Sequence, residues 1–170
     1  REDWPDHVAS IMAANAEPGP LTVRVNPQHN SRDEYMSALG AAGVDATPCT
    51  HAAGGIRIAQ GVRAGELPGF AAGHCTVQDE SSQLAVPLLG DVAGRRVLDL
   101  CAAPGGKTTH LLELGADVLA VDVDQSRLDV LHDNLARLRL SCDVRCADAA
   151  DLRAAEVGQF ELLLLDAPCT

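Results

Sequence analysis

Apolar and polar residues alternate over short stretches in the first half of the chain. Such alternation is typical of half-buried strands, and we expect strands at residues 21–26, 44–48, 56–59 and 75–78. Ser31 and Glu34 form a capping box that predicts the start of a helix, which ends at Gly43. The apolar face of this helix is formed by Tyr35, Met36, Leu39 and Ala42. Further helices are expected at residues 5–16 and about 79–89, so the pattern predicts a small α+β domain.

From Gly94 onward the rhythm changes to longer apolar runs separated by helical stretches. Four such runs predict strands, at residues 97–100, 118–121, 144–146 and 160–165. Helices are expected between the first three, at residues 107–114 and 125–138, and a shorter connection at about 149–156 precedes the fourth. Strands that alternate with helices indicate an α/β fold with a parallel, doubly wound sheet and right-handed crossovers.

These patterns divide the chain into three parts. Residues 1–20 combine a short helix with a turn-forming linker, Glu17-Pro18-Gly19-Pro20. Residues 21–92 are expected to form the small α+β domain, and residues 93–170 the first four strands of the α/β sheet. Sheets of this kind usually have more than four strands, and stopping there leaves an open edge. We therefore expect the chain to be a fragment of a longer protein.

The formal charge of the 170 residues is −11, which argues against a broad nucleic-acid-binding surface, because phosphate contacts need Lys and Arg. The basic residues are dispersed apart from a local group on one predicted helix, Arg127, Arg137 and Arg139. If the protein acts on nucleic acid, its electrostatic contacts are therefore local or lie outside these residues.

Two kinds of segment that would place the protein elsewhere are missing from the sequence. No apolar run approaches the ~20 residues of a membrane span, and the charged first residues do not resemble a signal peptide. The six cysteines are scattered, which fits a reducing cytosol better than a disulfide scaffold, so we expect a cytoplasmic protein. Cys142 and Cys146 are spaced as C-x3-C but lack further ligands, and no metal site is expected.

A glycine turn follows the first apolar run of the second half, and it is the strongest candidate for a ligand site. The turn is Cys101-Ala102-Ala103-Pro104-Gly105-Gly106-Lys107, and the next helix begins near Lys107. Glycines remove side chains where a ligand approaches the backbone, and the free N–H groups of a helix N-terminus favour a polar or anionic group. An ordinary strand-to-helix turn is the plainer alternative.

Two common nucleotide motifs do not fit this turn. A dinucleotide site needs G-x-G-x-x-G, whereas these glycines are adjacent and the third is absent. A P-loop needs a glycine where this chain has Cys101. Gly106-Lys107-Thr108 therefore matches only the last three residues of that motif.

Acidic residues follow each of the later apolar runs. Asp122 stands where nucleoside-binding sheets carry the acid that binds ribose hydroxyls, while Asp124 is the better candidate for a helix cap. Asp148 could meet an adenine edge or simply cap a turn. Asp166-Ala167-Pro168-Cys169 ends the fourth run, at the sheet edge where such folds place their chemistry, and an acid beside a thiol suits nucleophilic or acid/base work.

Taken together, these motifs closely resemble those of the RNA cytosine-C5 methyltransferase family, and in particular its bacterial branch that acts on small-subunit ribosomal RNA. The likeness rests on Cys-Ala-Ala-Pro-Gly-Gly-Lys-Thr, Val-Asp-Val-Asp, Asp148 and Asp-Ala-Pro-Cys. It extends upstream to residues 21–26 and 77–83, which look like the linking domain of that family. The resemblance implies a Rossmann-like methyltransferase sheet after an RRM-like linking domain, with residues 1–20 as the tail of an upstream helical region.

The resemblance also implies a cofactor, S-adenosylmethionine, and an RNA substrate. By position, the cofactor would be bound by Cys101, Ala102, Ala103, Pro104, Gly105, Gly106, Lys107, Asp122, Asp148 and Asp166. Within that set Asp122 would bind the ribose hydroxyls and Asp148 the adenine side. Asp166 would activate the cytosine near N3, and Cys169 would assist product release. In the family the attacking nucleophile is a cysteine in a later Thr-Cys motif, which these residues lack, so they are expected to be inactive alone.

Three other interpretations stay open at this point. Cys169 could itself attack, as the Pro-Cys thiol does in DNA cytosine-C5 methyltransferases, although residues 101–107 do not look like that family. A dinucleotide-dependent reductase is disfavoured by the missing glycine. The chain could also be a non-catalytic RNA-binding or assembly module with a methyltransferase-like fold, an interpretation favoured by its acidity and by the missing nucleophile.

Overall fold

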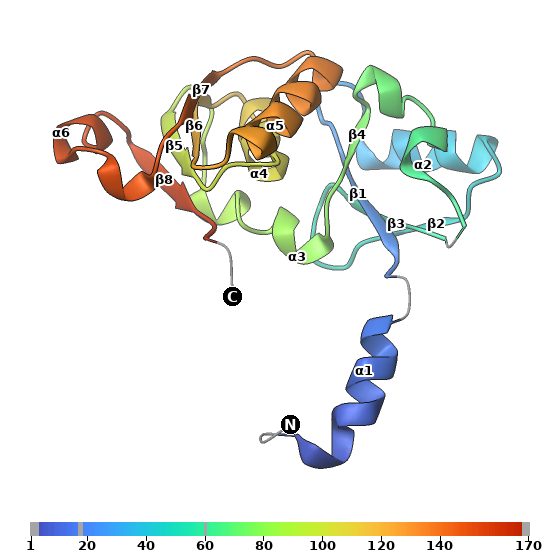
Figure 1. The fold of residues 1–170 in the computed structure, drawn as a ribbon. Coiled ribbons are helices and arrows are strands. Elements are labelled where there is room, and N and C mark those ends of the chain that lie inside the picture. The colour runs from blue at the N-terminus through green and yellow to red at the C-terminus, as the bar shows by residue number, and fades with distance from the viewer. Residues whose placement is uncertain (1–3, 17–18, 60, 168–170) are drawn as a thin grey trace.

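A four-stranded antiparallel sheet forms the first half of the protein (Figure 1). The computed structural model describes residues 4–16, 19–59 and 61–167. The strands are β1 (Leu21–Val25), β2 (Ala46–Pro48), β3 (Gly55–Ile58) and β4 (Cys75–Val77), in the order β2-β3-β1-β4. Helix α2 (Arg32–Ala41) starts at the expected capping box of Ser31 and Glu34 and covers one face of the sheet. The predicted α+β order of elements is confirmed.

A parallel sheet forms the second half, as the apolar runs predicted. Its strands are β5 (Arg96–Leu100), β6 (Asp117–Asp122), β7 (Asp143–Cys146) and β8 (Leu162–Leu165), in the order β7-β6-β5-β8. Helices α4 (Gly106–Glu113) and α5 (Gln125–Leu138) pack on one face. The connection from β7 to β8, with η5 (Ala149–Asp151) and α6 (Ala154–Val157), packs on the other.

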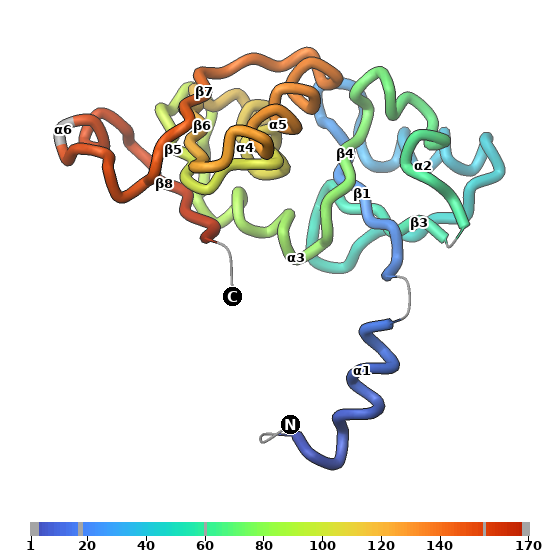
Figure 2. The backbone as a smooth tube through the Cα atoms, viewed as in Figure 1, coloured from blue at the N-terminus to red at the C-terminus, as the bar shows by residue number. Residues whose placement is uncertain are grey.

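The segment between the two sheets differs from its prediction. The expected helix at 79–89 is broken into α3 (Glu80–Gln83) and the short turn η4 (Pro87–Leu89). Pro87 explains the break, because a proline lacks the N–H of an interior helical residue and its ring clashes with the carbonyl one turn earlier. Figure 2 shows the chain passing from β4 through α3 into the second sheet, so this broken segment lies beside both.

The remaining short elements lie outside the two sheets. The expected helix at 5–16 is present as η1 (Pro5–His7) and α1 (Val8–Ala16), and it projects from the first sheet with none of its described residues buried (Figure 1). Two short 3-10 turns that the pattern did not predict, η2 (Ala64–Glu66) and η3 (Phe70–Ala72), precede β4. Over the described ranges, no helix has both the length and the apolar content that crossing a membrane requires.

The polar face of the first sheet is buried against the second half of the protein. Along β1, Val23 and Val25 face the core under α2, while Thr22, Arg24 and the following Asn26 are buried on the other side. Gln28 extends the contact by donating to the carbonyls of Leu112 and Glu113 at the end of α4. The alternation therefore marks an interface between the two sheets rather than a solvent-exposed face.

Arg137 on α5 closes the interface at its other end. Its guanidinium donates to the backbone oxygens of Phe70 at 2.8 Å and Cys75 at 3.0 Å, and lies 4.3 Å from the centre of the Phe70 ring. These contacts tie α5 to η3 and β4, so both helices of the second sheet are attached to the first.

Helix α5 offers a direct test of the packing that supports the second sheet. Leu131 is fully buried among Ala102, Ala120 and Leu128, so Leu131→Ala is expected to lower the free energy of unfolding by about 2–5 kcal/mol. Val130, the preceding residue, is 47% exposed, and Val130→Ala is expected to change the free energy of unfolding by about 0.5 kcal/mol or less. Urea unfolding of the two variants checks this, and equal losses would contradict the described packing.

Candidate functional site

A cavity of about 210 Å³ lies at the carboxyl ends of β5 and β8, between the two halves of the protein. The second half contributes Asp99, Cys101, Ala102, Ala103, Pro104, Gly106, Lys107 and Asp166. The first half and the segment after it contribute Val77, Gln78, Asp79 and Ser82. Seven of these residues were expected from the sequence as cofactor-binding residues, and the cavity brings them together with Asp99 and with a wall that the sequence did not predict.

The turn after β5 has its shape because of two residues with left-handed backbone. Cys101 has φ +59° and Gly105 has φ +100°, a conformation that strongly favours glycine. A Cβ on Gly105 would also lie 3.1 Å from Leu131 Cγ. Gly106, by contrast, begins α4 and leaves ordinary van der Waals room beside Gln78. The glycine requirement thus comes from backbone geometry and helix packing at Gly105, which does not itself line the cavity.

Asp122 lies behind this turn, at the end of β6, and is 2% exposed. One carboxylate oxygen accepts from the N–H of Ala103 at 3.0 Å, and the other accepts from the N–H of Asp124 at 3.1 Å. Arg127 from α5 pairs with the same carboxylate at 3.3 Å and also donates to the Ala103 carbonyl. Asp122 therefore supports the turn from behind and does not line the cavity, while Asp124 caps α5 as expected.

The two remaining candidate residues are not part of this cavity. Asp148 is exposed and accepts from the N–H of Ala150 at 2.9 Å, which is the turn-capping alternative weighed for it. Cys169 lies outside the described residues, together with Pro168. The structure thus brings the turn after β5 and Asp166 together, and leaves Asp148 at a separate position beside β7.

Carboxylates dominate the charge of the cavity. Among the described residues that line the cavity, Lys107 is the single cation. Its ammonium pairs with Asp166, whose side chain is 59% exposed at the rim. Asp99 is almost fully buried and accepts from the Thr108 hydroxyl at 2.6 Å. Burial raises the pKa of Asp99 from 3.8 to about 6, against the opposing effects of Thr108 and Lys107. The cavity is therefore suited to a ligand with a positive centre.

Cys101 is the described cysteine that lines this cavity, and its surroundings do not favour a thiolate. Burial raises the pKa of its thiol, and the nearby Asp122 carboxylate raises it further. Cys142, behind α5, is half-buried with a pKa raised by burial to about 11. Within the described ranges, no cluster of His, Cys, Asp and Glu has an arrangement that could hold a metal ion.

Two parts of the site were not assigned from the sequence motifs. Gln78 and Ser82 belong to another part of the chain and reach the cavity only through the packing of the two halves. Asp99 did offer a signal, because a carboxylate inside an apolar strand must be paired or protonated when it is buried. Two members of the basic group on α5, Arg127 and Arg137, are engaged in internal contacts.

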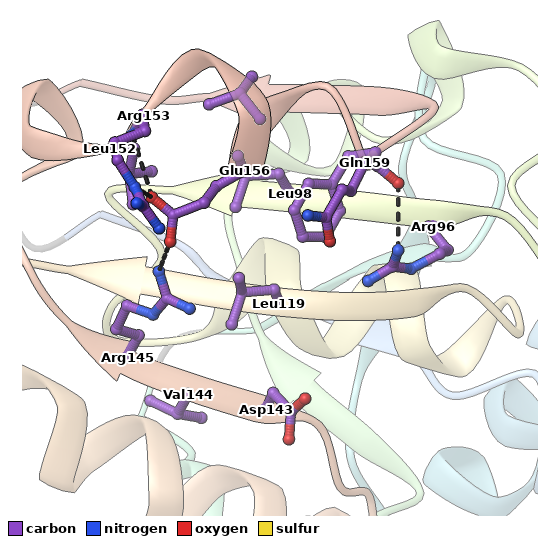
Figure 3. Close-up of a pocket in the computed structure, with 12 residues that line it drawn as sticks. Arg96, Leu98, Leu119, Asp143, Val144, Arg145, Leu152, Arg153, Glu156 and Gln159 are labelled. Carbon is purple, nitrogen blue, oxygen red and sulfur yellow. Dashed lines mark hydrogen bonds and ion pairs between the residues drawn. The ribbon is translucent and has the colours of Figure 1, made fainter.

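A larger cavity of about 540 Å³ lies on the other face of the second sheet, under the β7–β8 connection (Figure 3). Three of its charged groups are already paired with one another: Glu156 accepts from Arg145 at 3.2 Å and from Arg153 at 3.1 Å. Arg96 donates to the Gln159 carbonyl at 3.2 Å. Parallel sheets bind ligands at the carboxyl ends of their strands, so we take the smaller cavity as the candidate site.

Asp99 makes the stability of the protein depend on pH in a predictable direction. Its folded-state pKa of about 6 lies above the ordinary 3.8, so its protonated form favours folding, and that contribution is lost as the pH rises through about 6. Asp99→Asn is therefore expected to gain stability relative to the unmodified protein between pH 4 and pH 7. Urea unfolding at both values checks the sign.

Thr108→Val serves as the matched variant for this measurement. It removes the hydrogen bond that favours ionised Asp99, so its own loss of stability between pH 4 and pH 7 is expected to exceed that of the unmodified protein. A pH-independent difference for both variants would contradict the described environment of Asp99.

Comparison with known proteins supports the interpretation of both halves. Residues 86–170 match the family described as 16S rRNA methyltransferase RsmB/F, and residues 1–64 match the ferredoxin-like domain of RsmF/B-like methyltransferases. The ribosomal RNA small subunit methyltransferase B of Pseudomonas putida is 43% identical over 171 residues, which cover 98% of this chain and 39% of that protein. The protein of the same name from Yersinia enterocolitica is 44% identical, over 98% of this chain and 40% of that protein.

Solved structures show the same arrangement of elements. A methyltransferase homolog protein from Pyrococcus horikoshii matches with a TM-score of 0.79 at 29% identity, over 98% of this chain and 56% of that chain. NSun6 from Pyrococcus horikoshii, in a structure with SFG, matches with a TM-score of 0.74 at 19% identity, over 95% of this chain and 66% of that chain, and shows the shared fold. The chain spans about two fifths of the length of the curated relatives named above. On the match over residues 86–170, the chain belongs to the 16S rRNA methyltransferase RsmB/F family.

Proposed function

We propose that the intact protein transfers a methyl group from S-adenosylmethionine to C5 of a cytosine in small-subunit ribosomal RNA, and that this chain supplies the methyl-donor pocket. The observation that carries the proposal is the acidic cavity at the carboxyl ends of β5 and β8, in a chain of this family. The turn after β5 lines this cavity, and its residues resemble the cofactor motif of RNA cytosine-C5 methyltransferases.

The charge of the cavity fits this cofactor better than a dinucleotide. S-adenosylmethionine carries a sulfonium and an ammonium group, and the cavity lining holds Asp79, Asp99 and Asp166. A dinucleotide carries phosphates, whereas Lys107 is already paired with Asp166. The N-terminus of α4 begins at the cavity with Gly106 and offers N–H groups to the carboxylate of the cofactor.

We assign Asp122 to the ribose hydroxyls of the cofactor, in line with its position at the end of β6. Its carboxylate is already bonded to the Ala103 N–H and to Arg127. The Arg127 side chain is 44% exposed, so it is the partner that a ribose would displace, and its bond to the Ala103 carbonyl would be lost with it. Asp148 is assigned to the adenine side, which requires it to give up its present role as a turn cap.

The proposed chemistry requires activation of the cytosine ring, because C5 is a poor nucleophile. A thiolate adds at C6 and forms a covalent bond, which makes C5 electron-rich. A proton or hydrogen bond donated to N3 stabilises the charge that develops. We assign this part to Asp166, whose carboxyl is exposed at the rim of the cavity and has to carry a proton in order to donate. S-adenosylmethionine, when bound, supplies the methyl group as an electrophile. A base then removes the C5 proton, and the thiol leaves from C6.

We assign the attacking thiol to a cysteine outside these 170 residues. Cys101 is a poor candidate because burial and Asp122 raise the pKa of its thiol. The Thr-Cys pair that carries the nucleophile in the resembling family does not occur in the sequence. Residues 1–170 alone are therefore expected to transfer no methyl group to RNA, and turnover by them would refute this assignment.

Cofactor binding by the intact protein tests the proposed pocket. Calorimetry is expected to show S-adenosylmethionine binding, and Asp122→Asn is expected to weaken it by about tenfold or more, because it removes the carboxylate that accepts from the ribose. Asp124→Asn, two residues away, replaces one helix cap by another and is expected to bind the cofactor normally. Absence of binding by the unmodified protein would overturn the proposal, while normal binding by Asp122→Asn would remove Asp122 from the site.

Cys169 distinguishes product release from nucleophilic attack. If Cys169 assists product release, Cys169→Ser in the intact protein is expected to accumulate a covalent RNA adduct, detectable by denaturing gel electrophoresis. If Cys169 is itself the nucleophile, the same variant forms no adduct and transfers no methyl group. Loss of both the adduct and methyl transfer would assign nucleophilic attack to Cys169, as in DNA cytosine-C5 methyltransferases, in place of product release.

A further inference from the structure

Arg24 is a buried cation on β1, in the first half of the protein, and it directs its hydrogen-bond donors at helix α4 and at Gln78. Its Nε and Nη2 donate to the two oxygens of Glu113 at 3.0 and 2.9 Å, and Nη2 also donates to Thr109 Oγ1 at 3.1 Å. Its Nη1 donates to the Gly106 carbonyl at 2.8 Å and to Gln78 Oε1. An arginine has five N–H donors, and here each has an acceptor.

Three of these acceptors lie on one face of α4, the helix that begins at the turn after β5. Gly106, Thr109 and Glu113 follow the i, i+3, i+7 spacing of a helix face, so a single guanidinium contacts the helix from its first residue to its last. Because the fork of an arginine is planar and rigid, these contacts fix where α4 starts and how it is rotated.

The fourth acceptor is itself part of the cavity wall. Gln78 lines the cavity, and its side-chain Nε2 lies 3.4 Å from the Ser82 carbonyl. Its backbone carbonyl accepts from Gln83 Nε2 at 2.9 Å. Gly106 lines the same cavity from the opposite half. Arg24 does not line the cavity, yet it holds one residue of each wall through the same nitrogen, Nη1.

We propose that Arg24 is a positioning residue of the methyl-donor pocket, which it sets by joining Gln78 of the first half to Gly106 of the second. The inference rests on the pocket proposed above. It gives the first sheet a role in cofactor binding, in addition to any part that it takes in recognising RNA. Replacement of Arg24 is therefore expected to change affinity for S-adenosylmethionine even when the fold is retained.

A paired substitution separates this role from simple stabilisation. Arg24→Met alone leaves the buried Glu113 without its partner and is expected to destabilise the fold. Arg24→Met combined with Glu113→Leu replaces the ion pair by apolar side chains, which buried sites often tolerate, so the urea midpoint is expected to return toward that of the unmodified protein. The contacts to Gly106 and Gln78 stay lost, and affinity for S-adenosylmethionine, measured by calorimetry on the intact protein, is expected to remain at least about tenfold weaker.

Two further variants keep the test decisive. Arg24→Lys retains a charge for Glu113 but has three donors in place of five, so it cannot keep all of these contacts. It is expected to raise the KM for S-adenosylmethionine with little change in the KM for RNA. Arg137→Met removes the other interface arginine, which bonds to Phe70 and Cys75, and is expected to lower stability without weakening cofactor binding.

Each result points to one conclusion. Normal cofactor affinity in the double variant, or in Arg24→Lys if the double variant fails to fold, would show that Arg24 is structural only and would overturn the inference. A rise confined to the KM for RNA would also overturn it. Failure of the unmodified protein to bind S-adenosylmethionine would instead overturn the proposed function, so the two failures are distinguishable.

Discussion

The buried ion pair between Arg24 and Glu113 constrains how the two halves of the protein meet. Their side chains are 2% and 0% exposed, so neither charge can be solvated by water. A buried pair of this kind is tolerated only when its remaining donors are also satisfied, which accounts for Gln78, Thr109 and the Gly106 carbonyl around the guanidinium. A shift of one sheet past the other would leave these groups unpaired, so the pair specifies a single arrangement of the interface.

The sequence predicted each sheet well, because each is determined by local periodicity and turn residues. The capping box at Ser31 and the four apolar runs after Gly94 lie where the structure has the corresponding elements. The prediction of one continuous helix at 79–89 is wrong, because Pro87 interrupts it despite the helical pattern. The face of β1 with Arg24 was the harder case, since an alternating strand normally exposes its polar side, and only tertiary packing shows that this side is buried.

The candidate site was predictable to the extent that it is built from the ends of strands. The turn after β5 and Asp166 lie together because parallel strands place their carboxyl ends at one edge of the sheet. Asp122 lies directly behind the turn, in a supporting position that spacing alone could not distinguish from a lining one. Gln78 could not be predicted at all, because its place in the cavity depends on the interface held by Arg24.

The acidity of the protein argues against a broad contact with RNA, and part of that acidity is concentrated at this cavity. Arg127 donates to the turn after β5 and Arg137 donates to the backbone of the first half, so both guanidiniums are engaged in internal contacts. The acids, in contrast, include three that line the cavity, and one of these, Asp99, is buried strongly enough to raise its pKa. A positive ligand offsets this concentration of carboxylates, whereas a phosphate would add to it. The same charge distribution that disfavours a large nucleic-acid footprint on these residues is therefore compatible with the cationic ligand proposed for this cavity.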